Sequence, residues 1–366
     1  MGANEKLLNE LVEAVFKEGA SDLHIAEGRS PVIRVSNFLI PLVKIPVISK
    51  EDMNSILSTF LSLEQKKEFD NTKEINFAYS HNPARPDDSG HSGGGKERFR
   101  CNAYQTLGKT NVAMRLVPTS VKTFAELNLP SILESFAKRQ QGFFLVVGPI
   151  GVGKSTTLAT MIETINLERL EHIITIEDPI EFIFEPKKAI IDQREVRLDT
   201  PNFHTALHGV FRQDADIVMI GEMRDPETIS TAVTAAETGH LVLSTLHTNT
   251  ASQTVDRIID SFPSDQQSQI RLQLSSSLLG IFSQRLIPRI SGGLIPAYEL
   301  LINNNAISNL IREKRTHEIG AVIETSSEDG MIDLNRSLAG LVRSGEITVE
   351  NAFQFASNPK ALERMI

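Results

Sequence analysis

The chain has 366 residues, of which 40% are hydrophobic and 23% are charged, a composition typical of a globular protein large enough for two domains. Its 37 basic and 46 acidic side chains give a net charge of −9, the wrong sign for a protein that coats nucleic acid. No apolar run approaches the ~20 residues that cross a bilayer, and the N-terminus lacks the apolar core of a signal peptide. The single cysteine, Cys101, excludes an intramolecular disulfide and a tetracysteine zinc site. We therefore expect a cytoplasmic protein that does not coat nucleic acid nonspecifically, although this charge balance still leaves room for a local basic groove.

Residues 1–118 predict a small α+β domain. Apolar residues between Lys6 and Phe16 recur on one helical face, and Gly19 ends that helix. A second helix is expected near residues 51–63, and strand-like runs lie at 23–25, 32–35, 75–79, 99–104 and 111–116. The segment 81–97 is dense in Pro, Asp, Ser and Gly and has little to bury, so we expect a disordered loop there. Residues 119–141, flanked and punctuated by prolines, read as a linker.

Residues 142–290 have the pattern of a parallel α/β domain. Short apolar strands are expected at 143–147, 173–176, 217–220 and 241–246, separated by helical patterns, as parallel βαβ units require. One of those helices carries apolar residues at Phe203, Leu207, Val210 and Phe211. After Pro288 the pattern turns helical, with amphipathic segments at 306–313 and 334–342, so residues 291–366 are expected to form a helical C-terminal region.

The strongest motif is the run from Gly148 to Ser155, which fits G-x-x-x-x-G-K-[ST] and lies between a predicted strand and a predicted helix. Its glycines let backbone N–H groups converge on phosphate oxygens, and the helix N-terminus adds positive potential. Lys154 can reach the β- and γ-phosphates, and Ser155 can bind Mg²⁺. The motif predicts an ATP site formed by Gly148, Gly151, Val152, Gly153, Lys154, Ser155 and Thr156.

Carboxylates and a histidine follow other predicted strands. Glu222 ends the strand 217–220, where a Walker B acid would approach Mg²⁺, and Glu177, Asp178 and Glu181 follow the strand 173–176. Like charges gathered near a phosphate site indicate a metal or a proton-transfer role, although a solvated turn has the same composition. His247, after the strand 241–246, could contact the γ-phosphate or hold a purely structural place.

Taken together, these segments resemble the type II/IV secretion ATPase superfamily and, within it, the PilT-like type IV pilus retraction ATPases. The resemblance covers nearly the whole chain, and its most specific parts are residues 175–182 (TIEDPIEF), 193–196 (QREV), 221–225 (GEMRD) and 245–248 (TLHT). It departs at Ser308, where the family has arginine in the segment 306–313. The resemblance implies a PAS-like N-terminal domain, a RecA-like ATPase domain, and a homohexamer that binds ATP and Mg²⁺ between neighbouring subunits. It also implies that Glu181 activates water and that Glu222 has the Walker B role.

Arginines complete the predicted site, because the charge on a transferred γ-phosphate must be neutralised. Arg100 and Arg115 lie on N-terminal strands that resemble the arginine-bearing segment of the family, and Arg212 precedes the Walker B strand. We expect one of the first two to act across a subunit interface and Arg212 to act within the subunit.

The resulting hypothesis is a hexameric motor that couples ATP hydrolysis to type IV pilus retraction and twitching motility. It would lie at the cytoplasmic face of the inner membrane, held there by the pilus platform protein and machinery. One alternative is a pilus-assembly or type II secretion ATPase, although those proteins usually carry an extra N-terminal domain and a tetracysteine insertion, for which this chain has neither the length nor the cysteines. The others are a weakly hydrolysing accessory paralogue, against which the intact Lys154, Glu181 and Glu222 argue, and a RecA-like nucleic-acid motor, which the acidic balance disfavours.

Overall fold

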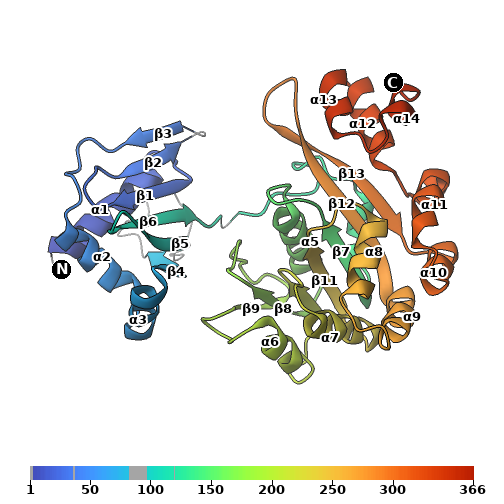
Figure 1. Ribbon diagram of the computed structural model, residues 1–366, viewed down its shortest axis with the longest axis horizontal. Helices are drawn as coiled ribbons and strands as arrows, with labels where there is room; N and C mark the ends of the chain where they lie inside the picture. The colour runs from blue at the N-terminus through green and yellow to red at the C-terminus, as the bar shows by residue number, and fades with distance from the viewer. Residues whose placement is uncertain (1–2, 36–37, 82–96, 119) are drawn as a thin grey trace. The chain divides into compact units, whose positions relative to one another are not determined.

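The computed structural model describes residues 3–35, 38–81, 97–118 and 120–366 (Figure 1). These residues group into two compact units, one from residues 1–119 together with 181–183, and one from residues 120–180 and 184–366. The predicted loop 81–97 falls almost wholly outside the described residues.

The described part of the first unit forms a six-stranded antiparallel sheet in the order β3-β2-β1-β6-β5-β4. The strands are β1 (Asp22–Ala26), β2 (Val32–Val35), β3 (Phe38–Pro41), β4 (Glu74–His81), β5 (Glu97–Thr106) and β6 (Lys109–Leu116). The helices are α1 (Ala3–Lys17), α2 (Lys50–Phe60) and α3 (Leu63–Thr72). Helix α1 buries Leu8, Leu11, Val12 and Val15 in a core shared with the sheet, at the i, i+3, i+4, i+7 spacing of one helical face.

Local sequence sets the ends of these elements. Ser49 and Ser62 begin α2 and α3 as capping boxes, in which the serine side chain accepts the N3 amide and the N3 side chain accepts the serine amide. Strands β5 and β6 are joined by Leu107 and Gly108, which have φ values of 50° and 73°. Two consecutive positive φ angles match the right-handed twist of a hairpin, so this turn fixes the β5–β6 register.

The second unit is built on a seven-stranded sheet in the order β13-β12-β7-β11-β10-β8-β9, and residues 120–180 and 184–366 are all described. The strands are β7 (Gly142–Val147), β8 (His172–Glu177), β9 (Ile190–Glu195), β10 (Ile217–Ile220), β11 (Leu241–Leu246), β12 (Leu278–Pro288) and β13 (Leu294–Ile302). All neighbours are parallel except β13, which pairs antiparallel with β12. Every residue of β7 and β11 is buried, which explains their continuous apolar runs. The parallel strands therefore present their carboxyl ends along one edge.

Helices cover the sheet, and further helices follow its last strand up to the C-terminus. Alternate residues Phe143, Leu145 and Val147 of β7 enter a core formed with α6, α7, α8 and α9, while Phe144 packs on Phe136 of α4. Helix α5 contacts α4 and β7. The helices are α4 (Ile132–Ala137), α5 (Lys154–Glu168), α6 (Phe203–Val210), α7 (Pro226–Glu237), α8 (Ala251–Asp260), α9 (Gln267–Ser277), α10 (Asn305–Arg312), α11 (Ile319–Thr325), α12 (Leu334–Arg343), α13 (Val349–Phe355) and α14 (Pro359–Glu363), with 3-10 turns η1 (Thr316–Glu318) and η2 (Ser327–Asp329).

The expectation that the chain turns helical directly after Pro288 is wrong. Residues Leu294–Ile302 form β13, which pairs with β12 along its whole length, and the helices begin only at α10. Gly292 and Gly293, with φ values of 88° and 77°, lie in the turn between the two strands. Adjacent glycines between two apolar runs are a hairpin signal, and it outweighs the weak helical periodicity of this segment.

Candidate functional site

The run Gly148–Gly153 links the carboxyl end of β7 to the N-terminus of α5, as the motif predicts. Gly148, Gly151 and Gly153 have φ values of 146°, 80° and 87°, which L-residues rarely adopt. A Cβ on Gly148 would lie 2.5 Å from the carbonyl oxygen of Gln284 on β12, so the loop passes too close to that strand for any side chain. Gly153 caps α5 in the left-handed conformation, and the first-turn N–H groups of a helix have no intrahelical acceptor. The loop therefore has the form of an anion cradle.

Lys154 folds back across this loop. Its ammonium group donates hydrogen bonds to the carbonyl oxygens of Gly148 at 2.9 Å and Pro149 at 2.8 Å, and it lies 3.2 Å from Nδ1 of His247. The residue is only 8% exposed. A buried ammonium beside the mouth of the cradle is placed to meet an entering phosphate, for which it can exchange the two carbonyls.

His247 connects the phosphate loop to the predicted Walker B acid. Its Nε2 lies 3.6 Å from Oε2 of Glu222, while Nδ1 faces Lys154. Lys154 has only donors, so Nδ1 accepts and the imidazole proton is assigned to Nε2, facing the carboxylate. Glu222 also pairs with Arg224, and this hydrogen bond raises the pKa of the Arg224 guanidinium. Residues from three strand ends thus form one continuous polar chain.

Hydrogen bonds within the sheet hold these strand ends in register. On β11, the Ser244 hydroxyl donates to the carbonyl oxygen of Ile220 at 2.9 Å, and the Thr245 hydroxyl donates to that of Gly221 at 2.6 Å. The N–H of Gly148 donates to the carbonyl oxygen of Leu246 at 3.3 Å. The segment carrying Glu222 and the start of the phosphate loop are both fixed to the strand that leads into His247.

These residues fit a nucleotide with Mg²⁺. The glycine cradle and Lys154 suit the phosphates, and Ser155 lies half-buried in the first turn of α5, where a P-loop hydroxyl meets the metal. Mg²⁺ bound through phosphates keeps several waters and needs only one or two protein ligands, a demand that Ser155 and Glu222 can meet. In the described ranges no group of three or more His, Cys, Asp or Glu residues forms a metal site by itself.

The predicted base and two of the three predicted arginines, Arg100 and Arg115, lie in the first unit. Glu181 belongs to the segment 181–183 that groups with this unit, and its carboxylate pairs with Arg100 at 2.7 Å. Arg115 is directly opposite Arg100 in the β5–β6 register, and its Nε donates to buried Asp22 at 2.7 Å. Arg34 is opposite Asp22 on β2, at 3.8 Å. Arginines on β2, β6 and β5 therefore lie in one row across the sheet, and Asp22 on β1 lies between Arg34 and Arg115.

Arg212 is not brought to the phosphate loop of its own unit. It lies exposed in the turn after α6 and precedes β10, so it is near the amino end of that strand. Glu222 follows the carboxyl end of the same strand. Four residues of strand span about 13 Å, so the two side chains leave from opposite edges of the sheet.

The structure adds two residues that no motif indicated. Gln284 on β12 accepts a hydrogen bond from the Thr157 hydroxyl of α5 at 2.7 Å, and its Nε2 would lie 3.2 Å from a Cβ on Gly153. The guanidinium of Arg285 reaches the other end of the loop, 3.4 Å from a Cβ on Gly148. Strand β12 is separated from the phosphate loop by more than a hundred residues, and its contacts with that loop had no local sequence signal.

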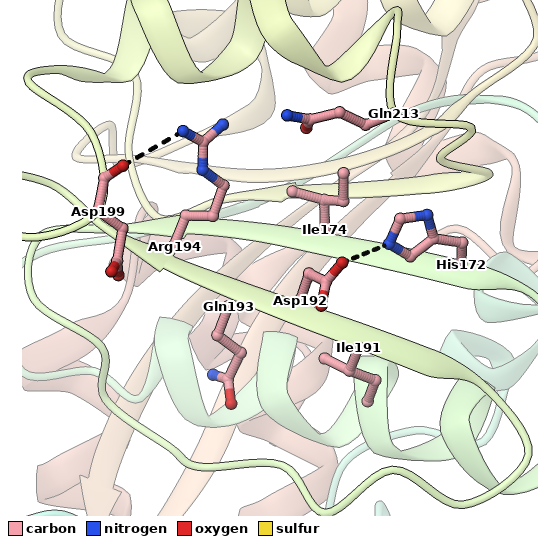
Figure 2. A pocket seen from close by; sticks show the side chains of 8 residues that line it. All are labelled: His172, Ile174, Ile191, Asp192, Gln193, Arg194, Asp199 and Gln213. Carbon is pink, nitrogen blue, oxygen red and sulfur yellow. Dashed lines mark hydrogen bonds and ion pairs between the residues drawn. The ribbon is translucent and has the colours of Figure 1, made fainter.

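A pocket of about 560 Å³ lies elsewhere, between β8, β9 and the loops that flank α6 (Figure 2). His172, at the amino end of β8, pairs there with Asp192 at 3.0 Å, and Arg194 donates to the carbonyl oxygen of Asp199 at 3.4 Å. Figure 2 shows Gln193 on the opposite side of β9 from Arg194, and Gln193 donates to Glu177 at 3.3 Å. The QREV segment, residues 193–196, forms the end of the edge strand β9 and the residue after it. The phosphate loop does not line this pocket.

Across the described ranges, none of the helices combines the length and the apolarity that a membrane span requires.

Comparisons with known proteins agree with this geometry. Residues 91–331 match the family model of type II/IV secretion system proteins. The chain is 40% identical over 353 residues to the type IV pilus retraction ATPase PilT of Pseudomonas aeruginosa, covering 96% of this chain and 99% of that one. It is 39% identical over 363 residues to the type IV pilus ATPase PilU of the same organism, covering 99% and 91%.

A solved structure gives the same result for the fold. The crystal structure of the pilus retraction motor PilT with bound ADP superposes with a TM-score of 0.87 at 41% identity, covering 98% of this chain and 99% of that chain. The predicted α/β fold and the predicted resemblance to PilT-like ATPases are confirmed by these matches. From its fold, its phosphate loop and its similarity over nearly its full length, the chain belongs to the type II/IV secretion system protein family.

Proposed function

We propose that this protein is a Mg²⁺-dependent ATPase that drives retraction of type IV pili. The observation that carries the proposal is the contact chain from Lys154 through His247 to Glu222 at the carboxyl edge of a parallel sheet. It joins a phosphate-binding loop to a carboxylate, which is the minimum that nucleotide hydrolysis requires of one subunit. The nearly full-length similarity to PilT supports pilus retraction as the work that hydrolysis performs.

In the proposed mechanism Lys154 would hold the β- and γ-phosphates, and Ser155 and Glu222 would hold Mg²⁺. When bound, the metal would neutralise phosphate charge that otherwise opposes attack by water. His247 keeps Glu222 and Lys154 in one arrangement, and its ring nitrogens can report whether the terminal phosphate is present. Glu181 is proposed as the base that takes the proton from the attacking water, with Glu222 as the second candidate for that role.

Arginines of the first unit are proposed to act on the nucleotide of a neighbouring subunit. Arg100 and Arg115 are directly opposite each other on adjacent strands, an arrangement of like charges that is destabilising unless an anion lies nearby. Glu181 pairs with Arg100 at 2.7 Å. Asp22 meets part of the demand for Arg115, whose side chain nevertheless remains 67% exposed. A γ-phosphate held by a neighbour would meet the rest, so Arg115 is the first candidate and Arg100 the second.

The functional unit is proposed to be a homohexameric ring, since arginines acting in trans require an interface that closes on itself. The ring would act at the cytoplasmic face of the inner membrane. Its proposed partners are the platform protein and the other pilus machinery there, with no nucleic acid involved.

A second candidate function is that of an accessory motor which hydrolyses ATP only weakly by itself. The similarity to the type IV pilus ATPase PilU, at 39% identity, nearly equals the similarity to PilT, so identity alone does not separate a retraction motor from another pilus ATPase. Intact Lys154, Glu181 and Glu222 argue for full hydrolysis and hence for the first candidate.

Deletion of the gene separates these functions. A retraction motor predicts cells with excess pili that no longer twitch, whereas an assembly motor predicts cells without pili. An accessory motor also predicts hyperpiliated deletion cells. In that case, however, the purified wild-type protein should show little ATP hydrolysis. Cells with normal pili and normal twitching would contradict the proposal.

A further inference from the structure

One face of the β12–β13 hairpin holds the segment that leads from His247 into α8. The Ser283 hydroxyl donates to the carbonyl oxygen of Asn249 at 2.8 Å, and Nη2 of Arg285 donates to that oxygen at 3.0 Å and to the Asn249 side-chain oxygen at 3.1 Å. Glu299, opposite Ser283 in the register, accepts the backbone N–H of Ala251 at 2.7 Å. Three side chains of the hairpin therefore hold residues 249–251.

The same guanidinium also reaches the phosphate loop. Nη1 of Arg285 donates to the carbonyl oxygen of Gln284 at 2.9 Å, the oxygen that a Cβ on Gly148 would approach to 2.5 Å. Arg285 thus spans the distance between the first glycine of the phosphate loop and Asn249, two residues after His247. Its planar fork suits this double contact, which a flexible ammonium group could not reproduce.

The cost of burying the charges of Arg285 and Glu299 indicates that these side chains have a specific role in holding the loop. Burial lowers the pKa of Arg285 and raises that of Glu299, so each charged form is penalised by its surroundings. Apolar residues could fill the same volume without that penalty. Charged groups held at such a place are better explained by the fixed arrangement that their hydrogen bonds give to the loop.

The hairpin continues this contact into the C-terminal helices. Ile287, Ile295 and Ala297 of the hairpin share a buried core with α12, α13 and α14. The Tyr298 N–H donates to the Ser337 hydroxyl of α12 at 3.1 Å. A displacement of the segment 247–251 would therefore be transmitted to β12, to β13 and to the helices that pack on them.

We propose that Arg285 is a positioning residue for ATP hydrolysis, which acts through Asn249 to keep His247 in place beside Lys154 and Glu222. The inference rests on the proposed ATPase activity. Its proposed action is indirect: it holds the segment that follows His247 through Asn249. It also joins that segment to the hairpin carrying the C-terminal helices.

A double-mutant cycle between Arg285 and His247 tests this in the full-length chain. Arg285→Ala is expected to lower kcat about tenfold or more, since small displacements of a catalytic group have effects of this size, and to reduce the preference for a non-hydrolysable ATP analogue over ADP. Arg285→Lys should recover only part of both quantities. In a His247→Ala background, Arg285→Ala should cause little further loss, because its effect passes through the histidine.

Arg289→Ala is the matched control. Arg289 is a half-buried arginine that directly follows β12, and its guanidinium pairs with Glu346 at 2.8 Å. This variant should leave kcat and nucleotide preference near the wild-type values. The inference would be overturned if the fold-losses in kcat of the two single variants multiply in the double variant, as independent effects do. An unchanged kcat in Arg285→Ala would overturn it as well. If Arg285→Ala does not fold, the same cycle is measured with Arg285→Lys. If the wild-type chain shows no ATPase activity, the proposed function itself is refuted. This measurement on the wild type comes before the variants, so the two failures are distinguishable.

Discussion

Replacing the first glycine of the phosphate loop by alanine tests how tightly this loop is built into the sheet. At Gly148 the added Cβ would lie 2.5 Å from the Gln284 carbonyl oxygen and 2.8 Å from Cγ2 of Val152, at a φ of 146°. Overpacking costs about 1–3 kcal/mol, and an L-residue in such a backbone conformation costs about 1–3 kcal/mol more. Gly148→Ala is therefore expected to lower the free energy of unfolding of the second unit by about 2–6 kcal/mol and to abolish ATP hydrolysis.

Gly151→Ala supplies the comparison within the same loop. Gly151 has a φ of 80° and no neighbour within 4 Å of an added Cβ, so only backbone strain of about 1–2 kcal/mol applies. Gly239→Ala, with a φ of 115° and an equally open site before β11, controls for strain away from the nucleotide and should keep ATPase activity.

Both quantities are accessible in solution. Unfolding in urea is followed by circular dichroism, because the chain has no tryptophan to serve as a fluorescent probe, and hydrolysis is followed by phosphate release. Equal stability of Gly148→Ala and Gly151→Ala within about 0.5 kcal/mol, or full activity of Gly148→Ala, would refute the argument that β12 and the phosphate loop are in close contact.

Other changes probe the proposed roles of single groups. Glu181→Gln should bind ATP normally and lose most turnover, because only proton abstraction is removed; a more severe loss in Glu222→Gln with intact binding would exchange the two roles. Burial raises the folded-state pKa of Glu299 above the ordinary 4.5, so the stability of the wild type relative to Glu299→Gln should be greatest below pH 4.5 and fall as pH rises through the raised pKa; urea midpoints that shift in parallel at every pH would contradict this. Arg115→Ala and Lys154→Ala should each be inactive, yet rings mixed from the two should recover activity, because one subunit keeps its arginine and the other its phosphate loop. Mixed rings without activity would place Arg115 outside the neighbour's site.

Local signals in the sequence were sufficient for much of the fold. The strand-loop-helix order around Lys154 is written in consecutive residues, and the buried strands β7, β10 and β11 are short apolar runs between turn residues. The expected helices near residues 51, 203, 306 and 334 are likewise present as α2, α6, α10 and α12. Elements were missed where the local pattern is ambiguous, as in the exposed edge strand β3, the polar edge strand β9, and β12, which continues directly from α9.

The site was predictable only in part for a similar reason. Motifs indicated Lys154, Glu222 and His247 separately, and the parallel sheet brings them together because its carboxyl ends share one edge. Gln284 and Arg285 reach the same place through a long crossover connection, and no residue near them in sequence reveals that contact. Such contacts are made by the fold and not by a motif, so only the three-dimensional structure reveals them.

The most direct measurement of the central proposal is pilus retraction in living cells. Fluorescently labelled pili are followed in a deletion strain that expresses either the wild-type chain or Lys154→Ala at equal levels. Loss of the ammonium that faces the β- and γ-phosphates removes hydrolysis, so wild-type cells should extend and retract pili, while Lys154→Ala cells should extend pili that stay extended. Normal retraction with Lys154→Ala, or cells of that strain without any pili, would contradict ATP-driven retraction by this protein.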